Sequence, residues 1–100
     1  MILEHADIRI HPGQQAQFDA AIARGVETVI AKAKGYLSHQ VQKGIESPER
    51  YLLMITWDTL ENHTVDFRGS AAFADWRAIV GPVFAVPPTV EHFNLLIESK

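Results

Sequence analysis

The sequence predicts an α+β fold of the ferredoxin-like type, with the order strand, helix, strand, strand, helix, strand. Two observations carry this prediction. Apolar residues alternate with polar ones in segments that read as strands, and they recur every three or four residues in segments that read as helices. The order implies a four-stranded antiparallel sheet with two helical segments on one face.

The first strand and helix have clear periodicities. Residues 2–10 alternate between an apolar and a polar set: Ala6, Ile8 and Ile10 against His5, Asp7 and Arg9. Residues 14–34 are predicted as a helix because their apolar side chains form one stripe. Gly35 follows where a helix-terminating glycine is expected.

The next two strands form a predicted hairpin. Residues 36–45 alternate again, and residues 46–50 are a turn cluster. Residues 51–57, YLLMITW, are a continuous apolar run, which is typical of a strand buried on both faces.

A second helical region is expected to begin at Asp58 or Thr59. Asp58 and Glu61 resemble a capping box, in which two side chains satisfy the first backbone amides of a helix. We expect a break near Gly69 and a restart with Ser70 as the new N-cap.

The last strand is predicted over residues 90–98, after a stiff entry at Pro87-Pro88. The third and fourth strands carry apolar residues on both faces, and a contiguous exposed apolar patch usually marks an interface. We therefore expect a homodimer whose sheets pack face to face. A monomer with a few exposed apolar side chains is the alternative.

Composition narrows the class of protein. One hundred residues fit a single domain, residues 1–100. The net charge of −3 and the scattered basic residues argue against nucleic acid or an anionic membrane as partner. The chain has no cysteine, which excludes disulfides and thiolate metal sites. No signal peptide or bilayer-spanning run is apparent, so we expect a soluble, cytoplasmic protein.

Two segments carry a resemblance to a known family. They are YLLMITWDTLENH, residues 51–63, and SAAFADWRAIVGPVFAVPPTVEHF, residues 70–93. The first resembles an aromatic strand that ends in Trp before a capped helix, and the second a helix rich in small residues before a last strand. With these segments, nearly the whole chain resembles the antibiotic biosynthesis monooxygenase family of dimeric α+β barrels. Its relatives include cofactor-free oxygenases of anthrones and quinols, haem-degrading oxygenases and members with no established role.

The resemblance implies a cofactor-independent monooxygenase that oxidises a small aromatic polyketide or quinol with molecular oxygen. Such chemistry requires a flat apolar pocket, a base and exclusion of water. His63 is the expected acid or base, and Asn62 and Arg68 are expected to orient an oxygen or stabilise an oxyanion. The expected substrate-binding walls are Trp57, Phe67, Phe73, Trp76 and Phe84. The resemblance also places Trp57 at the Trp that lines the pocket in some relatives, and no cofactor or metal is expected.

These residues also have structural interpretations. Trp57 ends an apolar strand and could belong to the core, and Trp76 could serve packing alone. His63 could lie on the surface or support another residue, and Asn62 could cap a helix.

Other functions remain open on the sequence. Three converging histidines, drawn from His5, His39 and His92, would make a metal site, but no metal-binding spacing is present. Haem degradation in this family uses an Asn on the first strand, which is absent here, and His63 lies too early to replace the helical His. A non-catalytic ligand-binding or assembly module, an isomerase and a decarboxylase are further alternatives on this fold.

Overall fold

The computed structural model describes residues 1–99 and confirms the predicted fold class. The main elements are β1 (Ile2–Arg9), α1 (Gln15–Thr28), β2 (Tyr36–Lys43), β3 (Arg50–Trp57), α2 (Ala71–Val80) and β4 (Thr89–Phe93). Short helical turns are η1 (Ile30–Lys32), η2 (Asn62–Phe67) and η3 (Gly81–Val83). The antiparallel sheet has the order β2-β3-β1-β4, as the ferredoxin-like pattern requires.

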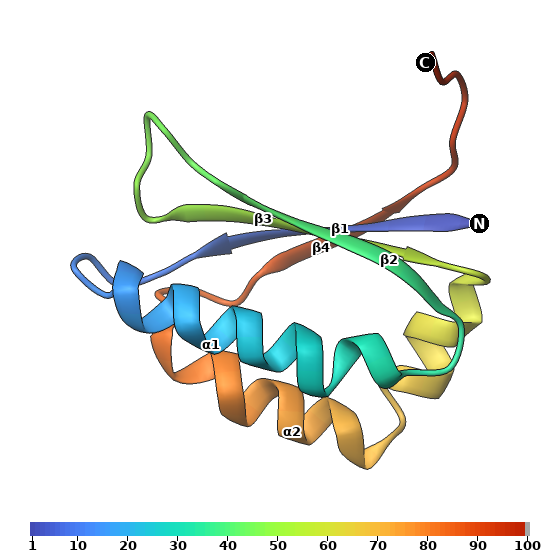
Figure 1. The fold of residues 1–100 in the computed structure, drawn as a ribbon, viewed down its shortest axis with the longest axis horizontal. Coiled ribbons are helices and arrows are strands. Elements are labelled where there is room, and N and C mark those ends of the chain that lie inside the picture. The colour runs from blue at the N-terminus through green and yellow to red at the C-terminus, as the bar shows by residue number, and fades with distance from the viewer. Residues whose placement is uncertain (100) are drawn as a thin grey trace.

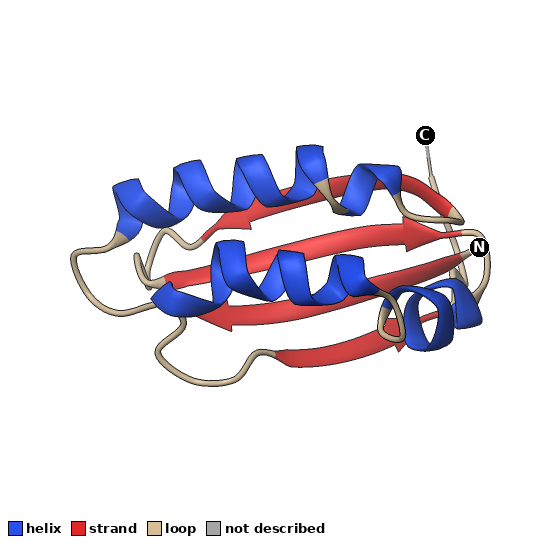
Figure 2. Cartoon of the chain, turned by 90° about the horizontal axis from the view of Figure 1, so that it is seen from below, coloured by secondary structure: helices blue, strands red, loops and turns tan. Residues whose placement is uncertain are grey.

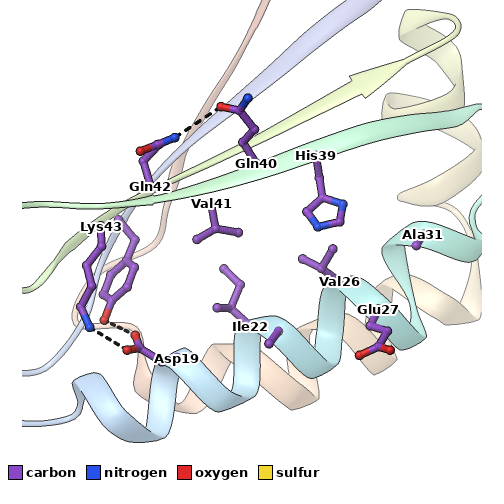
Figure 3. A pocket seen from close by; sticks show the side chains of 12 residues that line it. Asp19, Ile22, Val26, Glu27, Ala31, His39, Gln40, Val41, Gln42 and Lys43 are labelled. Atoms are coloured by element: carbon purple, nitrogen blue, oxygen red, sulfur yellow. Dashed lines mark hydrogen bonds and ion pairs between the residues drawn. The ribbon is translucent and has the colours of Figure 1, made fainter.

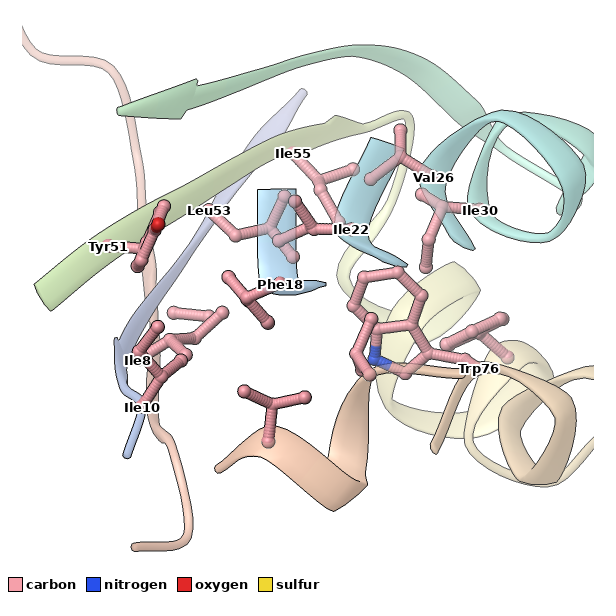
Figure 4. Packing of buried hydrophobic residues seen from close by; sticks show 14 of the residues in the cluster. Ile8, Ile10, Phe18, Ile22, Val26, Ile30, Tyr51, Leu53, Ile55 and Trp76 are labelled. Atoms are coloured by element: carbon pink, nitrogen blue, oxygen red, sulfur yellow. The ribbon is translucent and has the colours of Figure 1, made fainter. Parts of the chain in front are cut away.

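The chain forms two layers. Both helices lie on one face of the sheet, and no helix of the described chain covers the other face (Figure 1). Seen from the helical side, α1 and α2 run side by side, and η2 lies at one end of the sheet (Figure 2). The apolar core fills the space between the layers, where Phe18 and Ile22 of α1 lie near Leu53 of β3 (Figure 4). No helix in residues 1–99 is long and apolar enough to cross a membrane.

The register of β1 places one charged residue among the apolar side chains that face the helices. Glu4 lies opposite Ile55 of β3 on one side and opposite His92 of β4 on the other. Glu4, Ala6 and Ile8 are all buried, which follows from the period-two alternation of a strand with one covered face. The sheet register therefore fixes the position of the Glu4 carboxyl.

Several predicted boundaries differ from the structure. The helix expected over 14–34 ends at Thr28 and is followed by the short turn η1, although Gly35 has the expected positive φ of 82°. β3 is buried on alternate residues only, so the expectation of burial on both faces is wrong for the single chain. The strand expected over 90–98 ends at Phe93, because the following residues leave the sheet (Figure 1).

The capping box at the second helical region is shifted by one residue from the prediction. Asn62 N donates to Thr59 Oγ1, and Thr59 N donates to Asn62 Oδ1, so the reciprocal pair is Thr59 and Asn62. Ser70 is the N-cap residue of α2 as predicted, but its hydroxyl donates back to Phe67 O.

The segment η2 is a π-helix, in which a backbone amide bonds to the carbonyl five residues earlier. Arg68 N donates to His63 O at 3.1 Å in this pattern. The start of η2 is fixed against the loop before β2, since Asn62 packs directly on Gly35 and Asp58 N donates to Gly35 O. This contact positions His63, the residue after Asn62.

The close approach at Gly35 leads to a stability prediction. In Gly35→Ala, the added Cβ would overlap the Asn62 side chain. The alanine would also have to adopt the left-handed backbone conformation of Gly35. Gly13 has a similar φ of 79° but open space around it, so Gly13→Ala isolates the backbone strain. We expect Gly13→Ala to lower the free energy of unfolding by about 1 kcal/mol. Gly35→Ala should lower it by about 2 kcal/mol more, because of the added overlap. Urea unfolding of both variants measures this difference, and equal losses would contradict the packing argument.

Candidate active site

A cavity of about 990 Å³ lies between the sheet and the second helical region. Its walls come from β1, β3, η2 and α2 and from the segment 81–90, which leads into β4. Most of the lining is apolar, but it includes Glu4 of β1, His63 of η2, Arg68 directly after η2 and Arg77 of α2. An apolar pocket with a few converging polar groups is the usual form of a small-molecule site.

The Glu4 carboxyl is the central polar group of this cavity. Glu4 as a whole residue is only 5% exposed. Trp57 Nε1 donates to Glu4 Oε1 at 2.9 Å, and His63 Nε2 lies 3.3 Å from the same oxygen. The carboxyl is therefore held between β3 and η2 through a single oxygen.

A second histidine extends this arrangement. His63 Nδ1 and His92 Nε2 are 2.8 Å apart, within hydrogen-bond distance. His63 is buried, whereas His92 on the edge strand β4 is half-buried. Glu4, His63 and His92 thus form a continuous polar chain from the cavity to the β4 edge; we call it the Glu4–His63–His92 chain.

Burial shifts the pKa values of this chain in opposite directions. Removal from water raises the pKa of Glu4 to about 7, against the opposing effects of the Trp57 hydrogen bond and the Arg68 charge. Removal from water, the Arg68 charge and His92 lower the pKa of His63 to about 4. Burial and Arg68 also lower the pKa of His92. At neutral pH the histidines are therefore uncharged, and the Glu4 carboxyl lies close to its titration midpoint.

Several aromatic rings pack around His63, the middle residue of the Glu4–His63–His92 chain. The His63 ring stacks on Trp57 with 5.4 Å between ring centroids and lies 6.2 Å from Phe67. Phe67 in turn meets Phe73 of α2 edge-on at 5.7 Å. These rings keep water from the imidazole, which is consistent with its lowered pKa.

The structure brings most of the predicted site residues to the cavity. His63, Arg68, Phe67, Phe73, Trp76 and Phe84 line it. Trp57 does not line it: the indole is fully buried and contacts Glu4 instead, so its place is behind the carboxyl and not at the pocket wall. Asn62 does not line it either, because its amide bonds to Thr59 N and to Asp66 Oδ2.

Glu4 and His92 are site residues that the sequence did not predict. Glu4 belongs by alternation to the apolar set of the first strand, and a charged residue on a buried face is an informative exception. The sequence suggests His92 only as a metal ligand with His5 and His39, yet those two lie elsewhere. His5 contacts Phe93 on the uncovered face, and His39 contacts Tyr36 on β2.

A second hollow, of about 730 Å³, lies between α1 and β2 (Figure 3). Its charged groups satisfy one another: Lys43 Nζ lies 2.6 Å from Asp19 Oδ2, and the Tyr51 hydroxyl donates to Asp19 Oδ1. Asp19 and Lys43 are about half exposed, so their charges remain in contact with water. The cavity at Glu4 is the stronger candidate because Glu4 and His63 are buried and because burial shifts the pKa of each towards its uncharged form.

No group of three or more His, Cys, Asp or Glu residues within 1–99 has the arrangement of a metal site. In the Glu4–His63–His92 chain, the two ring nitrogens of His63 point to different partners. The three side chains of the Glu4–His63–His92 chain contact one another in a line, and their polar atoms do not converge on a common point.

Comparison with known proteins identifies the family. The profile of the antibiotic biosynthesis monooxygenase family matches residues 1–79. The chain belongs to this family. The resemblance seen in the sequence is thereby confirmed.

Individual relatives extend this result. The Bacillus subtilis (strain 168) protein YczJ, which is uncharacterized, is 39% identical over 94% of this chain and 98% of its own length. A Bordetella bronchiseptica crystal structure, provisionally assigned as an antibiotic biosynthesis monooxygenase, is 41% identical with a TM-score of 0.90; the match covers 96% of this chain and 97% of that chain. A mutant of SnoaB from Streptomyces nogalater, described as a cofactor-independent oxygenase, has a TM-score of 0.82 over 97% of this chain and 94% of its own. At 13% identity, SnoaB shares the fold only.

The opposed pKa shifts predict opposed pH dependences of stability. The raised pKa of Glu4 contributes stability that is present below pH 4.5 and is lost as the pH rises through about 7. The lowered pKa of His63 contributes stability that is present above pH 6.5 and is lost as the pH falls through about 4. The two contributions oppose each other between pH 4.5 and 6.5 in the wild type.

A variant that removes one of the two titrating groups should reveal the pH dependence of stability that the other contributes. Relative to the wild type, we expect the stability of Glu4→Gln to rise more steeply with pH in this window and that of His63→Gln to fall. The change should amount to about 1–3 kcal/mol across the window, because a tenfold change in a protonation equilibrium corresponds to about 1.4 kcal/mol. Urea unfolding at several pH values measures it, with Glu46→Gln, at an exposed position in the turn between β2 and β3, as control. Slopes that change in the same direction in both variants would refute the assignment.

Proposed function

We propose that this protein is a cofactor-independent monooxygenase that oxidises a small aromatic polyketide or quinol with molecular oxygen. The observation that carries the proposal is a buried carboxyl–imidazole pair, Glu4 and His63, beside a mostly apolar cavity with aromatic walls. Membership of the monooxygenase family supports the reaction class. The description of SnoaB as a cofactor-independent oxygenase on the same fold is consistent with it.

The cavity offers the groups that such a reaction needs. Phe67, Phe73 and Phe84 supply flat surfaces for an aromatic ring. The Glu4–His63 pair can accept the proton that an acidic phenol or anthrone releases, since one member has a pKa of about 7. Arg68 lines the cavity with a positive charge that can stabilise the resulting substrate anion.

The electron-rich anion can then reduce molecular oxygen directly. The substrate supplies all four electrons and two hydrogens: one oxygen atom becomes bonded to a ring carbon, and the other leaves as water with the two hydrogens that the substrate loses. The apolar walls keep water from the anion while it reacts. Under this proposal the chain's own residues bind the ring, accept its proton and hold the negative charge.

Oxygen uptake by the metal-free protein tests this proposal directly. The substrates are a panel of anthrones, naphthoquinols and hydroquinones, with the uncatalysed rate subtracted. We expect uptake above background without flavin, haem or metal, and an oxygenated product by mass spectrometry. Product formation without oxygen uptake would indicate an isomerase or decarboxylase, and tight binding without turnover would indicate a ligand-binding module; both outcomes reject the oxygenase.

A cavity-blocking variant ties the activity to this site. Ala78 lies on the cavity lining at an exposed position, so Ala78→Trp should obstruct the entrance without disturbing the core. We expect kcat/KM to fall by about 10-fold or more. Ala20→Trp places the same side chain at an exposed position on α1, away from the cavity, and should leave the rate unchanged. Equal rates in both variants would place the reaction elsewhere.

The proposal includes a homodimer formed by the uncovered sheet face. That face carries apolar side chains, including Leu3, Leu52, Met54 and Phe93, and no helix in the described chain packs on it (Figure 1). After β4 the chain leaves the sheet, and this segment exposes three more apolar side chains: Leu95 (64% exposed), Leu96 (90%) and Ile97 (83%). A large exposed apolar area of this kind favours a second copy as its cover. The cytoplasmic location stays a prediction from the sequence.

A charge at the centre of this face should dissociate the dimer. Met54 lies in the middle of β3, between His5 of β1 and Gln40 of β2. We expect Met54→Lys to shift the mass measured by light scattering from dimer to monomer, because the lysine charge would be buried without a partner. Val65→Lys also replaces an exposed apolar residue, but on η2, and should remain dimeric. A dimeric Met54→Lys protein would exclude this face as the interface.

A further inference from the structure

We propose that the Glu4 carboxylate is the base that accepts the substrate proton, and that His63 and His92 form a relay that passes this proton to solvent at the β4 edge. The catalytic step in this inference rests on the proposed oxygenase function. The relay is a property of the protein alone and can be measured without substrate.

The relay follows from the order of contacts. Glu4 lines the cavity, His63 Nε2 is 3.3 Å from Glu4 Oε1, and His63 Nδ1 is 2.8 Å from His92 Nε2. Glu4 and His63 are both buried, whereas His92, on the edge strand, is partly exposed. The path therefore connects the inner, sheet-side end of the cavity to water at the β4 edge through atoms that can both donate and accept protons.

Glu4 is better suited than His63 to be the base. Within residues 1–99, both contacts of the Glu4 carboxyl are made by Oε1. Every fully buried side-chain nitrogen or oxygen in these residues has a hydrogen-bond partner, and Oε2 has none, so Oε2 must be accessible. Because Glu4 lines the cavity, we take Oε2 to be the oxygen that faces it. His63 has one nitrogen engaged with His92. A base works best when its pKa is near the working pH, which favours Glu4 at about 7 over His63 at about 4.

The contacts define the proton positions when Glu4 is ionised. Glu4 Oε1 then accepts from Trp57 Nε1–H and faces His63 Nε2–H. A neutral imidazole carries one proton, so His63 Nδ1 must accept from His92 Nε2–H. In this state both histidines are Nε2–H tautomers: the Nε2 of His63 lies beside the carboxylate, and the Nε2–H of His92 donates to His63.

Protonation of Glu4 reverses these directions. The substrate C–H or O–H bond breaks, its electron pair stays on the substrate, and the proton binds Glu4 Oε2. Each histidine then changes tautomer by exchange with water: it loses its Nε2 proton to water and gains one from water on Nδ1, so the number of protons is unchanged. A half-turn of the carboxyl presents the O–H to the now unprotonated His63 Nε2, while His63 donates from Nδ1 to His92 Nε2 and His92 carries its proton on Nδ1. In the return step, Glu4 gives its proton to His63 Nε2, His63 Nδ1 gives one to His92 Nε2, and His92 Nδ1 releases one to water. One proton enters, one leaves, and both histidines change tautomer while remaining neutral.

The surrounding charges favour this neutral mechanism. Within residues 1–99, the other charged groups that line the cavity are Arg68, directly after η2, and Arg77 of α2, whereas the residue of β3 that contacts Glu4 is the uncharged Trp57. Arg68 disfavours an imidazolium at both His63 and His92. A tautomer exchange adds no net charge to either ring, so it avoids the cost of a buried cation next to an arginine.

The test is the pH dependence of the histidine tautomers in the substrate-free protein, measured by long-range ¹H–¹⁵N NMR of the imidazole rings between pH 5 and 9. We expect His63 and His92 to change together from Nδ1–H to Nε2–H with one midpoint near pH 7. Glu4→Gln should abolish the change, and His11→Gln, at an exposed loop position, should leave it intact. An imidazolium at His63 near that midpoint, or one fixed tautomer throughout, would overturn the relay.

A graded variant provides a second readout if Glu4→Gln fails to fold. Trp57→Phe removes the hydrogen bond that lowers the pKa of Glu4, so the common midpoint of both histidines should move to higher pH. An unchanged midpoint, or a shift at one histidine only, would overturn the coupling. In turnover, Glu4→Gln should reduce kcat by about 10²–10⁴-fold, and wild-type turnover of Glu4→Gln would reject Glu4 as the base. A coupled tautomer change in a protein without oxygen uptake would support the relay and reject the oxygenase, so the two failures are distinguishable.

Discussion

A carboxyl group enclosed by apolar side chains must have partners, and the site is organised around that requirement at Glu4. An isolated buried carboxylate costs several kcal/mol or changes its protonation state. Here the Trp57 indole and the His63 imidazole approach one carboxylate oxygen from different elements. Each of the two rings is therefore constrained by more than packing, because moving either would leave a buried acid without a contact.

The position of His63 depends on features remote from the cavity. Asn62 anchors the start of η2 through Thr59 and through its close packing on Gly35. The π-helical turn then carries His63 and Phe67 towards the sheet. Short π-helical segments recur at functional sites, since the wider turn reorients side chains that a regular helix would place differently. The loop before β2 and the turn after β3 thus act together to place one imidazole.

The fold could be predicted from sequence because its signals are local. Alternation in residues 2–10, the apolar stripe of the first helix and the glycine at Gly35 each depend on neighbours along the chain. The site depends on pairings between distant residues. The contact between Glu4 and His63 requires the register of β1 and the wound turn of η2, and the contact between His63 and His92 requires β4 to lie beside β1. The exception is Glu4 itself, whose place in an apolar alternation set was visible in the sequence.

The aromatic residues show the same limit. Trp57 and Phe67 are both large aromatic residues, and the sequence gives no sign that their places differ. In the structure Trp57 is fully buried behind Glu4, whereas Phe67 forms part of the cavity wall. Periodicity gives the face of an element that is buried. It does not say whether the buried face meets a packed core or an open cavity.

The short edge strand β4 has a dynamic consequence. It contributes five residues, and within residues 1–99 it pairs with β1 alone, so its amides belong to the least protected part of the sheet. Val90 lines the cavity and His92 ends the polar chain on this same strand. Fraying of one peripheral strand would thus open the cavity and break the contact between the two imidazoles in a single local event, while the sheet centre at β1 and β3 stays closed.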